Sequence, residues 1–367
     1  MRFPEFHGEW EEHGLSEYLD FKNGLNPDSK RFGKGIKFIS VMDILNNPVI
    51  TYDCIRASVQ ATDAEISSFS VENGDILFQR SSETLEDVGR ANVYIDDRVA
   101  LFGGFVIRGK KKANYNPLFF RYLLSSPYAR KRIIPMGAGA QHFNIGQEGL
   151  SKVLLNFPSI EEQTKIASLL HLLDERIATQ SKLIEKLESL IKGIAQKIVR
   201  SNKPNVRLSE CLECKSSTLQ ESDVYEQGTY PVYGANGIVG YLDNYNTESE
   251  AVYIIKDGSG VGTVSYVTGK CSATGTLNTL QAKDGYSLQY FYYLLKVFNF
   301  EPYKTGMAIP HIYFKDYGNA LFFCPSYTEQ LQYARLLFAI DSKLSAEQNI
   351  KTNISLQKQY LLREMFI

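Results

Sequence analysis

Cysteine and histidine are the first residues to consider for chemistry, because they bind metals and act as nucleophiles. Cys211-x-x-Cys214 has the spacing of half a zinc site, which needs a second pair of Cys or His ligands at suitable spacing. The other three cysteines and all five histidines lie at scattered positions, and none completes such a site. We therefore expect reduced thiols, and no metal site.

Motifs for cofactor, nucleotide or methyl-transfer chemistry are incomplete. Gly258-x-Gly260-x-Gly262 lacks the following helix pattern and the spacing of a dinucleotide loop. The segment 114–118 (Asn-Tyr-Asn-Pro-Leu) approaches the Asn-Pro-Pro-Tyr motif of adenine methyltransferases, but it lacks the second proline and the aromatic residue. It is typical of a cap before a helix at about 117–126. We therefore predict a chain with no catalytic residues of its own.

Composition favours a folded protein with two domains. The 367 residues are 44% hydrophobic and 22% charged, which is ordinary for a globular protein and enough for two cores. No apolar run approaches the roughly 18–20 residues of a membrane helix, and the N-terminus lacks the apolar stretch of a signal peptide. We expect a cytoplasmic protein without membrane contact.

Charge alone does not indicate a nucleic-acid partner. The formal net charge is −1, residues 1–157 carry 19 basic and 19 acidic residues, and residues 205–325 carry 8 and 12. DNA binding would therefore require that folding gathers cations on one face, or that a partner neutralises part of the phosphate charge.

An internal repeat is the strongest signal in the sequence. Residues 157–163 align with 324–330 at an offset of 167, and the match continues through Ala167 and Ala334 to Leu187 and Ile354. Residues 115–124 also resemble 286–295. Such a duplication predicts the order domain, long helix, domain, long helix.

Both long helices are predicted to begin with the same signal. Ser159 and Ser326 are each preceded by proline and followed three residues later by Glu162 or Glu329. This is the pattern of a capping box, in which the serine and glutamate side chains satisfy free backbone N–H groups. Proline keeps the preceding chain extended, so each helix should start at its serine.

An apolar seam follows each start. Spacings of three and four give the 3.5-residue period of a coiled coil. The predicted pairing residues are Ile166, Leu170, Leu173, Ile177, Ile184, Leu187 and Ile191 in the first helix and Leu337, Ile340, Leu344, Ile354 and Leu361 in the second. We predict that the helices pair within the chain as an antiparallel coiled coil. The alternatives are that each helix packs on its own domain, or pairs with a second copy of the chain.

Short strands separated by glycine turns fill the rest of each half, for example at 74–80 and 251–255. We predict an α+β fold with two α/β-mixed domains, each a mostly antiparallel, partly rolled sheet, related by a pseudo-twofold repeat and separated by the two long helices. The expected boundaries are 1–157 for the first domain, 158–203 for the central helix, 204–324 for the second domain and 325–367 for the C-terminal helix.

The sequence resembles the specificity subunits of type I restriction–modification systems over essentially the whole chain. The resemblance rests on Arg2-Phe3-Pro4-Glu5-Phe6-x-Gly8-x-Trp10, on the segments 36–44, 74–80 and 230–241, and on the Pro-x-x-x-Glu-Gln helix starts at 158 and 325. The order of these segments, together with the twofold repeat, makes the resemblance specific.

The resemblance implies a non-catalytic subunit that recognises a bipartite target in double-stranded DNA. Each target-recognition domain would read one half-target through the major groove, and the paired helices would fix the distance between halves. Two methyltransferase subunits and the motor–nuclease restriction subunits would be its partners. Those partners, rather than this chain, would bind S-adenosylmethionine, ATP and Mg. The alternative is a non-catalytic adaptor whose pseudo-symmetric domains bind proteins rather than DNA.

Candidate DNA contacts are polar side chains in loops and at strand ends, because Arg or Lys reads guanine and Asn or Gln reads adenine. In the first domain they are Lys30, Arg31, Lys34, Arg80, Ser81, Ser82 and Gln141, with Lys110, Lys111 and Lys112 as phosphate contacts. In the second domain they are Tyr233, Asn236, Lys256, Ser259, Asn278 and Lys304, in glycine-rich turns. The alternative for each cation is a solvated surface side chain, and for Asn236-Gly237 a plain turn.

Overall fold

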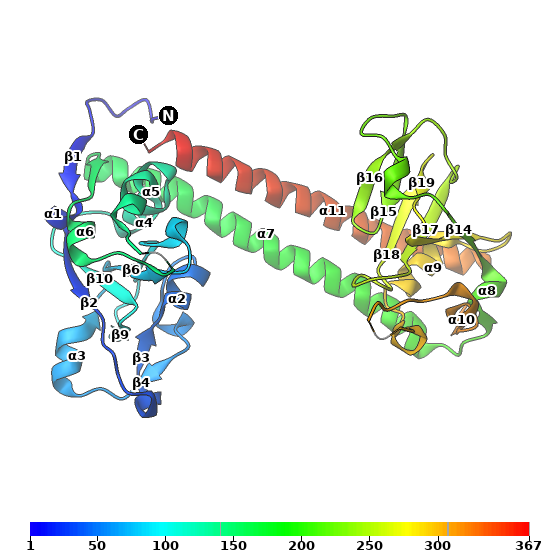
Figure 1. The fold of residues 1–367 in the computed structure, drawn as a ribbon, viewed down its shortest axis with the longest axis horizontal. Helices are drawn as coiled ribbons and strands as arrows, with labels where there is room; N and C mark the ends of the chain where they lie inside the picture. Colours follow the sequence, from blue (N-terminus) through cyan, green and yellow to red (C-terminus); the bar gives the residue numbers. More distant parts are fainter. Residues whose placement is uncertain (140, 307, 367) are drawn as a thin grey trace. The chain divides into compact units, whose positions relative to one another are not determined.

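The computed structural model describes residues 1–139, 141–306 and 308–366 (Figure 1). The chain forms two compact units: unit 1 is Met1–Gln180 with Ile350–Ile367, and unit 2 is Ser181–Asn349. Each unit has a hydrophobic core of its own. This mixed α and β architecture with long helices confirms the predicted fold class.

A four-stranded antiparallel sheet lies at the centre of unit 1. Its strand order is β2-β10-β6-β8. The strands span Leu19–Asn23 (β2), Val106–Lys111 (β10), Ile76–Gln79 (β6) and Ala91–Val93 (β8). All four residues of β6 are buried, which indicates a strand covered on both faces.

A second, mixed sheet in unit 1 has the order β4-β3-β9-β5, in which β3 and β9 are parallel. Its strands are β4 (Ser58–Val59), β3 (Phe32–Ile39), β9 (Ala100–Phe102) and β5 (Ser70–Val71). Two short pairs complete the strands of the unit: β1 (Glu11–Gly14) with β12 (Leu154–Phe157), and β7 (Ser81–Ser82) with β11 (Phe143–Asn144).

Short helices surround these sheets. The α-helices are α1 (Leu15–Tyr18), α2 (Val41–Asn46), α3 (Asp63–Phe69), α4 (Pro117–Ser125), α5 (Pro127–Ile133) and α6 (Gln147–Ser151). Single 3₁₀ turns are η1 (Ser29–Arg31), η2 (Tyr52–Cys54), η3 (Leu85–Asp87) and η4 (Ile134–Met136). Helix α4 buries the apolar face that carries Phe119, Phe120 and Leu123, and it packs on β8.

Unit 2 repeats the central sheet. Its antiparallel order is β14-β20-β17-β18, formed by Leu212–Ser216 (β14), Leu277–Ala282 (β20), Glu250–Ile255 (β17) and Val264–Thr268 (β18). In both sheets the strands that come first, fourth, second and third along the chain lie side by side in that order. The repeat seen in the sequence therefore extends to the topology of the sheets.

The remaining elements of unit 2 are fewer than those of unit 1. A three-stranded sheet has the order β16-β15-β19, at Gly237–Leu242 (β16), Tyr230–Gly234 (β15) and Ser272–Ala273 (β19). Strand β13 (Val206–Arg207) pairs with β21 (Leu321–Phe322). The short helices are α8 (Leu208–Cys211), α9 (Leu288–Leu295), α10 (Phe314–Tyr317), η5 (Glu221–Asp223) and η6 (Glu301–Tyr303).

The long helices α7 (Ile160–Ser201) and α11 (Tyr327–Glu364) begin directly after the serines that the sequence indicated. The Ser159 hydroxyl accepts from the Glu162 N–H at 3.4 Å, and the Ser326 hydroxyl accepts from the Glu329 N–H at the same distance. Glu329 reaches back to the Ser326 N–H at 3.1 Å. The buried Glu162 carboxylate instead binds Arg2, with Nε and Oε1 2.8 Å apart.

A glutamine in the first turn ties each long helix to the sheet-packed short helix of its unit. Gln163 Oε1 accepts from the Asn116 N–H at 3.1 Å, and Gln330 Oε1 accepts from the Ser287 N–H at 2.9 Å. Each glutamine Nε2 also donates to the carbonyl of the proline five residues earlier, at 3.0 Å. These shared contacts account for the glutamine at both helix starts.

The two helices are paired within each unit. In unit 1, Ile166 and Leu170 at the start of α7 share a buried cluster with Leu361 near the end of α11. In unit 2, the later part of α7 packs with the earlier part of α11, where Ile191 shares a cluster with Leu337. The helices therefore run antiparallel.

The seam residues differ in their burial. Those that are buried are Ile166, Leu170, Ile184, Ile191, Leu337, Leu344, Ile354 and Leu361. Those that are partly buried are Leu173, Ile177, Leu187 and Ile340.

Truncating the seam should destabilise unit 2 in a position-specific way. Leu337 is fully buried and its neighbour Leu336 is 51% exposed, so the two residues form a matched pair. We expect Leu337→Ala to lower the free energy of unfolding by about 2–5 kcal/mol, because it leaves a cavity, whereas Leu336→Ala should change it by less than about 0.5 kcal/mol. Urea denaturation of both variants measures this difference, and equal effects would contradict the pairing.

Candidate nucleic-acid interface

Arg80 and Lys256 occupy equivalent places in the two units. Arg80 directly follows β6 and Lys256 directly follows β17, which are corresponding central strands. The Arg80 N–H donates to the carbonyl of Phe105, just before β10, at 2.9 Å, and the Lys256 N–H donates to the carbonyl of Thr276, just before β20, at 3.0 Å. The Arg80 carbonyl accepts from Ile145 at 2.9 Å, and the Lys256 carbonyl accepts from Ile312 at 2.8 Å. The two isoleucines are themselves 167 residues apart, so the repeat places both cations.

A loop with the same closure lies beside each cation. Ala138 pairs with Asn144 in unit 1, and Thr305 pairs with His311 in unit 2, again at the offset of 167. Ser81, which follows Arg80, also pairs with Asn144, and Asp257, which follows Lys256, also pairs with His311. Each unit thus joins a strand-end cation to a closed loop, and we call this arrangement the strand-end site.

The strand-end site of unit 1 offers several polar groups. Arg80 is partly exposed, and its Nη1 donates to the Gly104 carbonyl at 3.2 Å. The Ser81 hydroxyl donates to Asn144, and Ser82 accepts from the Thr84 N–H at 3.2 Å. The guanidinium thus contacts a backbone carbonyl, and none of the ion pairs among the described residues involves it.

The strand-end site of unit 2 contains a cavity of about 500 Å³. Lys256, His311 and Lys315 line it together with Tyr313, whose side chain is half exposed. Its described lining includes no acidic residue. A cavity with two lysines and an exposed aromatic ring suits an anionic ligand that carries a flat ring, as a nucleotide does.

The other candidates in the first domain divide into paired and exposed residues. Arg31 Nη1 binds Glu65 Oε1 at 3.0 Å, and the guanidinium holds the pKa of Glu65 at about 2. Lys110 forms an ion pair with Glu72 at 2.7 Å. The Lys111 ammonium donates to the Tyr115 carbonyl at 3.1 Å. The exposed candidates are Lys30, Lys34, Lys112 and Gln141.

The candidates in the second domain divide in the same way. Asn278 is buried, and its Nδ2 donates to the Tyr317 hydroxyl at 3.0 Å. Tyr233 is partly buried with its ring centroid 5.7 Å from that of Tyr253, and Lys304 pairs with Glu301 at 2.5 Å. The exposed candidates are Asn236, in the turn between β15 and β16, and Ser259.

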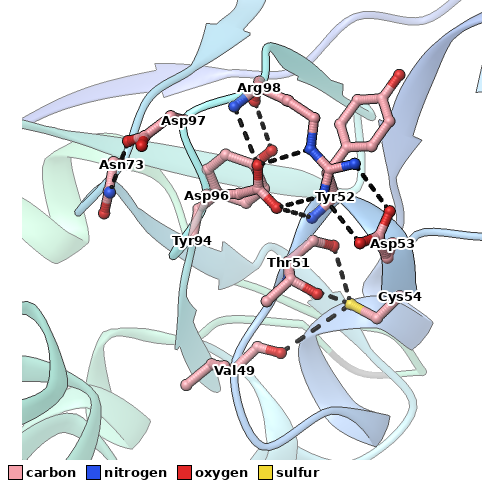
Figure 2. Close-up of polar contacts among 10 residues, drawn as sticks. All are labelled: Val49, Thr51, Tyr52, Asp53, Cys54, Asn73, Tyr94, Asp96, Asp97 and Arg98. Atoms are coloured by element: carbon pink, nitrogen blue, oxygen red, sulfur yellow. Dashed lines mark hydrogen bonds and ion pairs between the residues drawn. The ribbon is translucent and has the colours of Figure 1, made fainter.

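Arg98, which the sequence did not single out, is held by carboxylates. Figure 2 shows its guanidinium between Asp53 and Asp96 and over the Tyr52 ring, whose centroid is 4.4 Å away. Each carboxylate accepts from it at 2.9 Å. Asp97, also nearby, accepts from Asn73 at 3.0 Å. Because two aspartates bind this arginine, the cluster fastens η2 to the connection between β8 and β9 and does not favour a phosphate.

Acid should weaken the Arg98 cluster. Hydrogen bonds from Arg98 hold the pKa values of Asp53 and Asp96 below their usual range. A carboxyl group whose folded-state pKa is lowered stabilises the fold above its unfolded pKa of about 4, and this stabilisation is lost as the pH falls toward the folded value.

We therefore expect the thermal midpoint of the Arg98→Met variant to fall less between pH 5 and pH 3 than that of the parent protein. Arg56→Met, at an exposed neighbouring position, serves as the control and should keep the parent's pH dependence. An identical pH dependence in the parent and the Arg98→Met variant would show that the cluster does not contribute.

Within residues 1–139, 141–306 and 308–366, no three His, Cys, Asp or Glu residues are grouped to hold a metal ion, and no helix is both long and apolar enough to cross a membrane. The five cysteines are free thiols. Burial raises the pKa of Cys211 to about 12 and that of Cys214 to about 11, so this pair is protonated at neutral pH.

The chain is thus a protein of two repeated α/β units joined by antiparallel helices, with an equivalent strand-end cation in each unit. The family described as type I restriction modification DNA specificity domain matches residues 7–189 and 201–356. The chain therefore belongs to the type I restriction–modification specificity-subunit family, as the sequence resemblance indicated.

Two relatives illustrate the sequence similarity. A putative type I specificity subunit from Mycoplasma genitalium is 25% identical over 272 residues, which are 68% of this chain and 70% of that protein. A putative type I restriction enzyme specificity subunit from Methanocaldococcus jannaschii is 25% identical over 195 residues, which are 52% of this chain and 45% of that protein.

Solved structures share the fold. The crystal structure of a type I restriction–modification S subunit from M. genitalium matches with a TM-score of 0.69 at 18% identity, covering 100% of this chain and 99% of that one. A chain from a structural study of complex assembly in a type I system matches with a TM-score of 0.54 at 15% identity, covering 98% and 97%.

Proposed function

We propose that this chain is the sequence-reading subunit of a type I restriction–modification complex, and that each unit reads one half of a bipartite target in double-stranded DNA. The observation that carries the proposal is the repeated strand-end site, in which Arg80 and Lys256 occupy equivalent places. Two similar readers in one chain suit a target made of two separate halves, and family membership supports DNA as the ligand.

The chemistry of the two sites fits different half-sequences. The forked guanidinium of Arg80 can donate two hydrogen bonds to O6 and N7 of one guanine, and Ser81 and Ser82 follow it directly in the chain. Lys256 offers a single ammonium beside aromatic and histidine side chains, with the exposed Ser259 three residues later. We infer that the base preferences of the two units differ for this reason.

Charge supports a role for partner subunits. With a net charge of −1, the chain alone supplies few phosphate contacts, so other subunits would provide much of the neutralisation of the DNA backbone. We propose that two methyltransferase subunits and the motor–nuclease restriction subunits assemble on this scaffold. They would bind S-adenosylmethionine, ATP and Mg, while this chain contributes no catalytic group and no cofactor site.

The strand-end sites predict separable specificity defects in the assembled complex. We expect Arg80→Gln to relax base preference in one half-target only and Lys256→Gln to relax it in the other, each by about 1–3 kcal/mol of discrimination. Binding to DNA libraries randomised in one half-target at a time measures this. Lys131→Gln, at an exposed cation of α5, is the control and should keep both preferences.

Two results would contradict the assignment. Unchanged preference in both variants would remove Arg80 and Lys256 from base reading. A uniform loss of affinity with a shallower salt dependence would instead make them phosphate contacts.

A further inference from the structure

A second pocket lies in unit 1, with a volume of about 410 Å³. Residues of α2, β8, α4 and α5 and of the segments beside them line it. Three arginines, Arg90, Arg121 and Arg130, contribute to the lining, whereas Glu86 is its one acidic residue among those described. Three arginines therefore face one glutamate in this lining, and none of these arginines belongs to either strand-end site.

Arg130 is the least satisfied of the three arginines. Its Nη2 donates to the backbone carbonyls of Glu86 at 2.8 Å and Val88 at 2.6 Å. Its Nη1 is buried and has no hydrogen-bond partner. Burial, with the nearby charge of Arg90, lowers the pKa of Arg130 to about 10. No carboxylate among the described residues forms an ion pair with it, so the fold holds a charged donor in place without a matching acceptor.

The other two arginines are partly engaged. Arg90 pairs with Asp87 at 2.6 Å and keeps 54% of its side chain exposed. Arg121 lies 3.4 Å from Asp174, a long contact, and its guanidinium is 4.9 Å from the Tyr122 ring centroid. Both retain donors for an incoming anion, because a guanidinium has five N–H groups.

The walls of the pocket indicate which anion fits. Ile44, Leu45, Leu124 and Ile134 give it an apolar lining. On α2, Leu45 is exposed, and so is Met42, with 61% of its surface accessible. Arginine and methionine beside apolar surface are typical of protein–protein interfaces, whereas DNA interfaces are more polar. A carboxylate on an aliphatic stem matches both the guanidinium groups and the walls.

We propose that this pocket receives an acidic side chain of the methyltransferase subunit and so helps to dock that partner on unit 1. The inference rests on the proposed function, since that partner belongs to the proposed complex. A glutamate or aspartate would place its carboxylate at Arg130 and Arg90 and its methylene groups against Leu45 and Ile134.

The test measures the affinity of the full-length chain for its methyltransferase subunit by isothermal titration calorimetry. We expect Arg130→Gln and Arg90→Gln each to weaken this affinity by about tenfold or more, because each removes a charge-assisted contact. Lys131→Gln, next to Arg130 and exposed, is the matched control and should bind as the parent does. The Arg90→Gln variant keeps the test valid if Arg130→Gln fails to fold. The Arg90 side chain is half exposed, and among the described residues it makes no hydrogen bond to backbone carbonyls like those of Arg130.

The outcomes separate this inference from the proposed function. Parent-like affinity of the folded Arg90 and Arg130 variants for the methyltransferase subunit would overturn the docking pocket. Unchanged affinity for that subunit, combined with weaker and less salt-dependent DNA binding by the complex, would also overturn it and make the pocket a phosphate site. If the parent complex assembles but shows no sequence preference on DNA, the proposed function fails while the docking measurement still stands.

Discussion

A helix of about 40 residues with an apolar stripe is not stable in water unless another surface covers the stripe. The chain contains two such helices, of 42 and 38 residues, and each buries part of its stripe against the other within both units. The rest of the architecture depends on this mutual burial. Because the helices are antiparallel, the start of each one enters the core of a different unit, and the short helix and central sheet of that unit form around it.

The glutamine at each helix start adds hydrogen bonds to this apolar packing. Gln163 and Gln330 each satisfy a backbone N–H at the start of a short helix, so the long helix and the sheet-packed helix of each unit share hydrogen bonds as well as apolar contacts. About three turns further along each long helix, the Tyr122 hydroxyl donates to Asp174 at 2.8 Å and the Tyr293 hydroxyl donates to Asp341 at 3.4 Å. The same contacts therefore join the long helix to the short helix in both units.

The helix starts and the seam could be predicted because they depend on local patterns, namely a serine and a glutamate three residues apart and a 3.5-residue period. The equivalence of Arg80 and Lys256 could not be predicted, since they are 176 residues apart while the aligned segments are 167 or 171 apart. It emerges from the register of the central strands and from the backbone hydrogen bonds to Ile145 and Ile312. Ion pairs could not be predicted either. The sequence offered Arg31 as a DNA contact, but in the fold it binds Glu65, which is 34 residues away in the chain.

The central claim is that the two units read two separate half-targets. The most direct measurement is the methylome of a strain that expresses this subunit with its methyltransferase and no other modification system. The account predicts methylation at a single bipartite sequence, with two specific half-targets separated by a spacer of fixed length and arbitrary sequence. Methylation at one continuous sequence, or no sequence-specific methylation by an assembled and active complex, would contradict it.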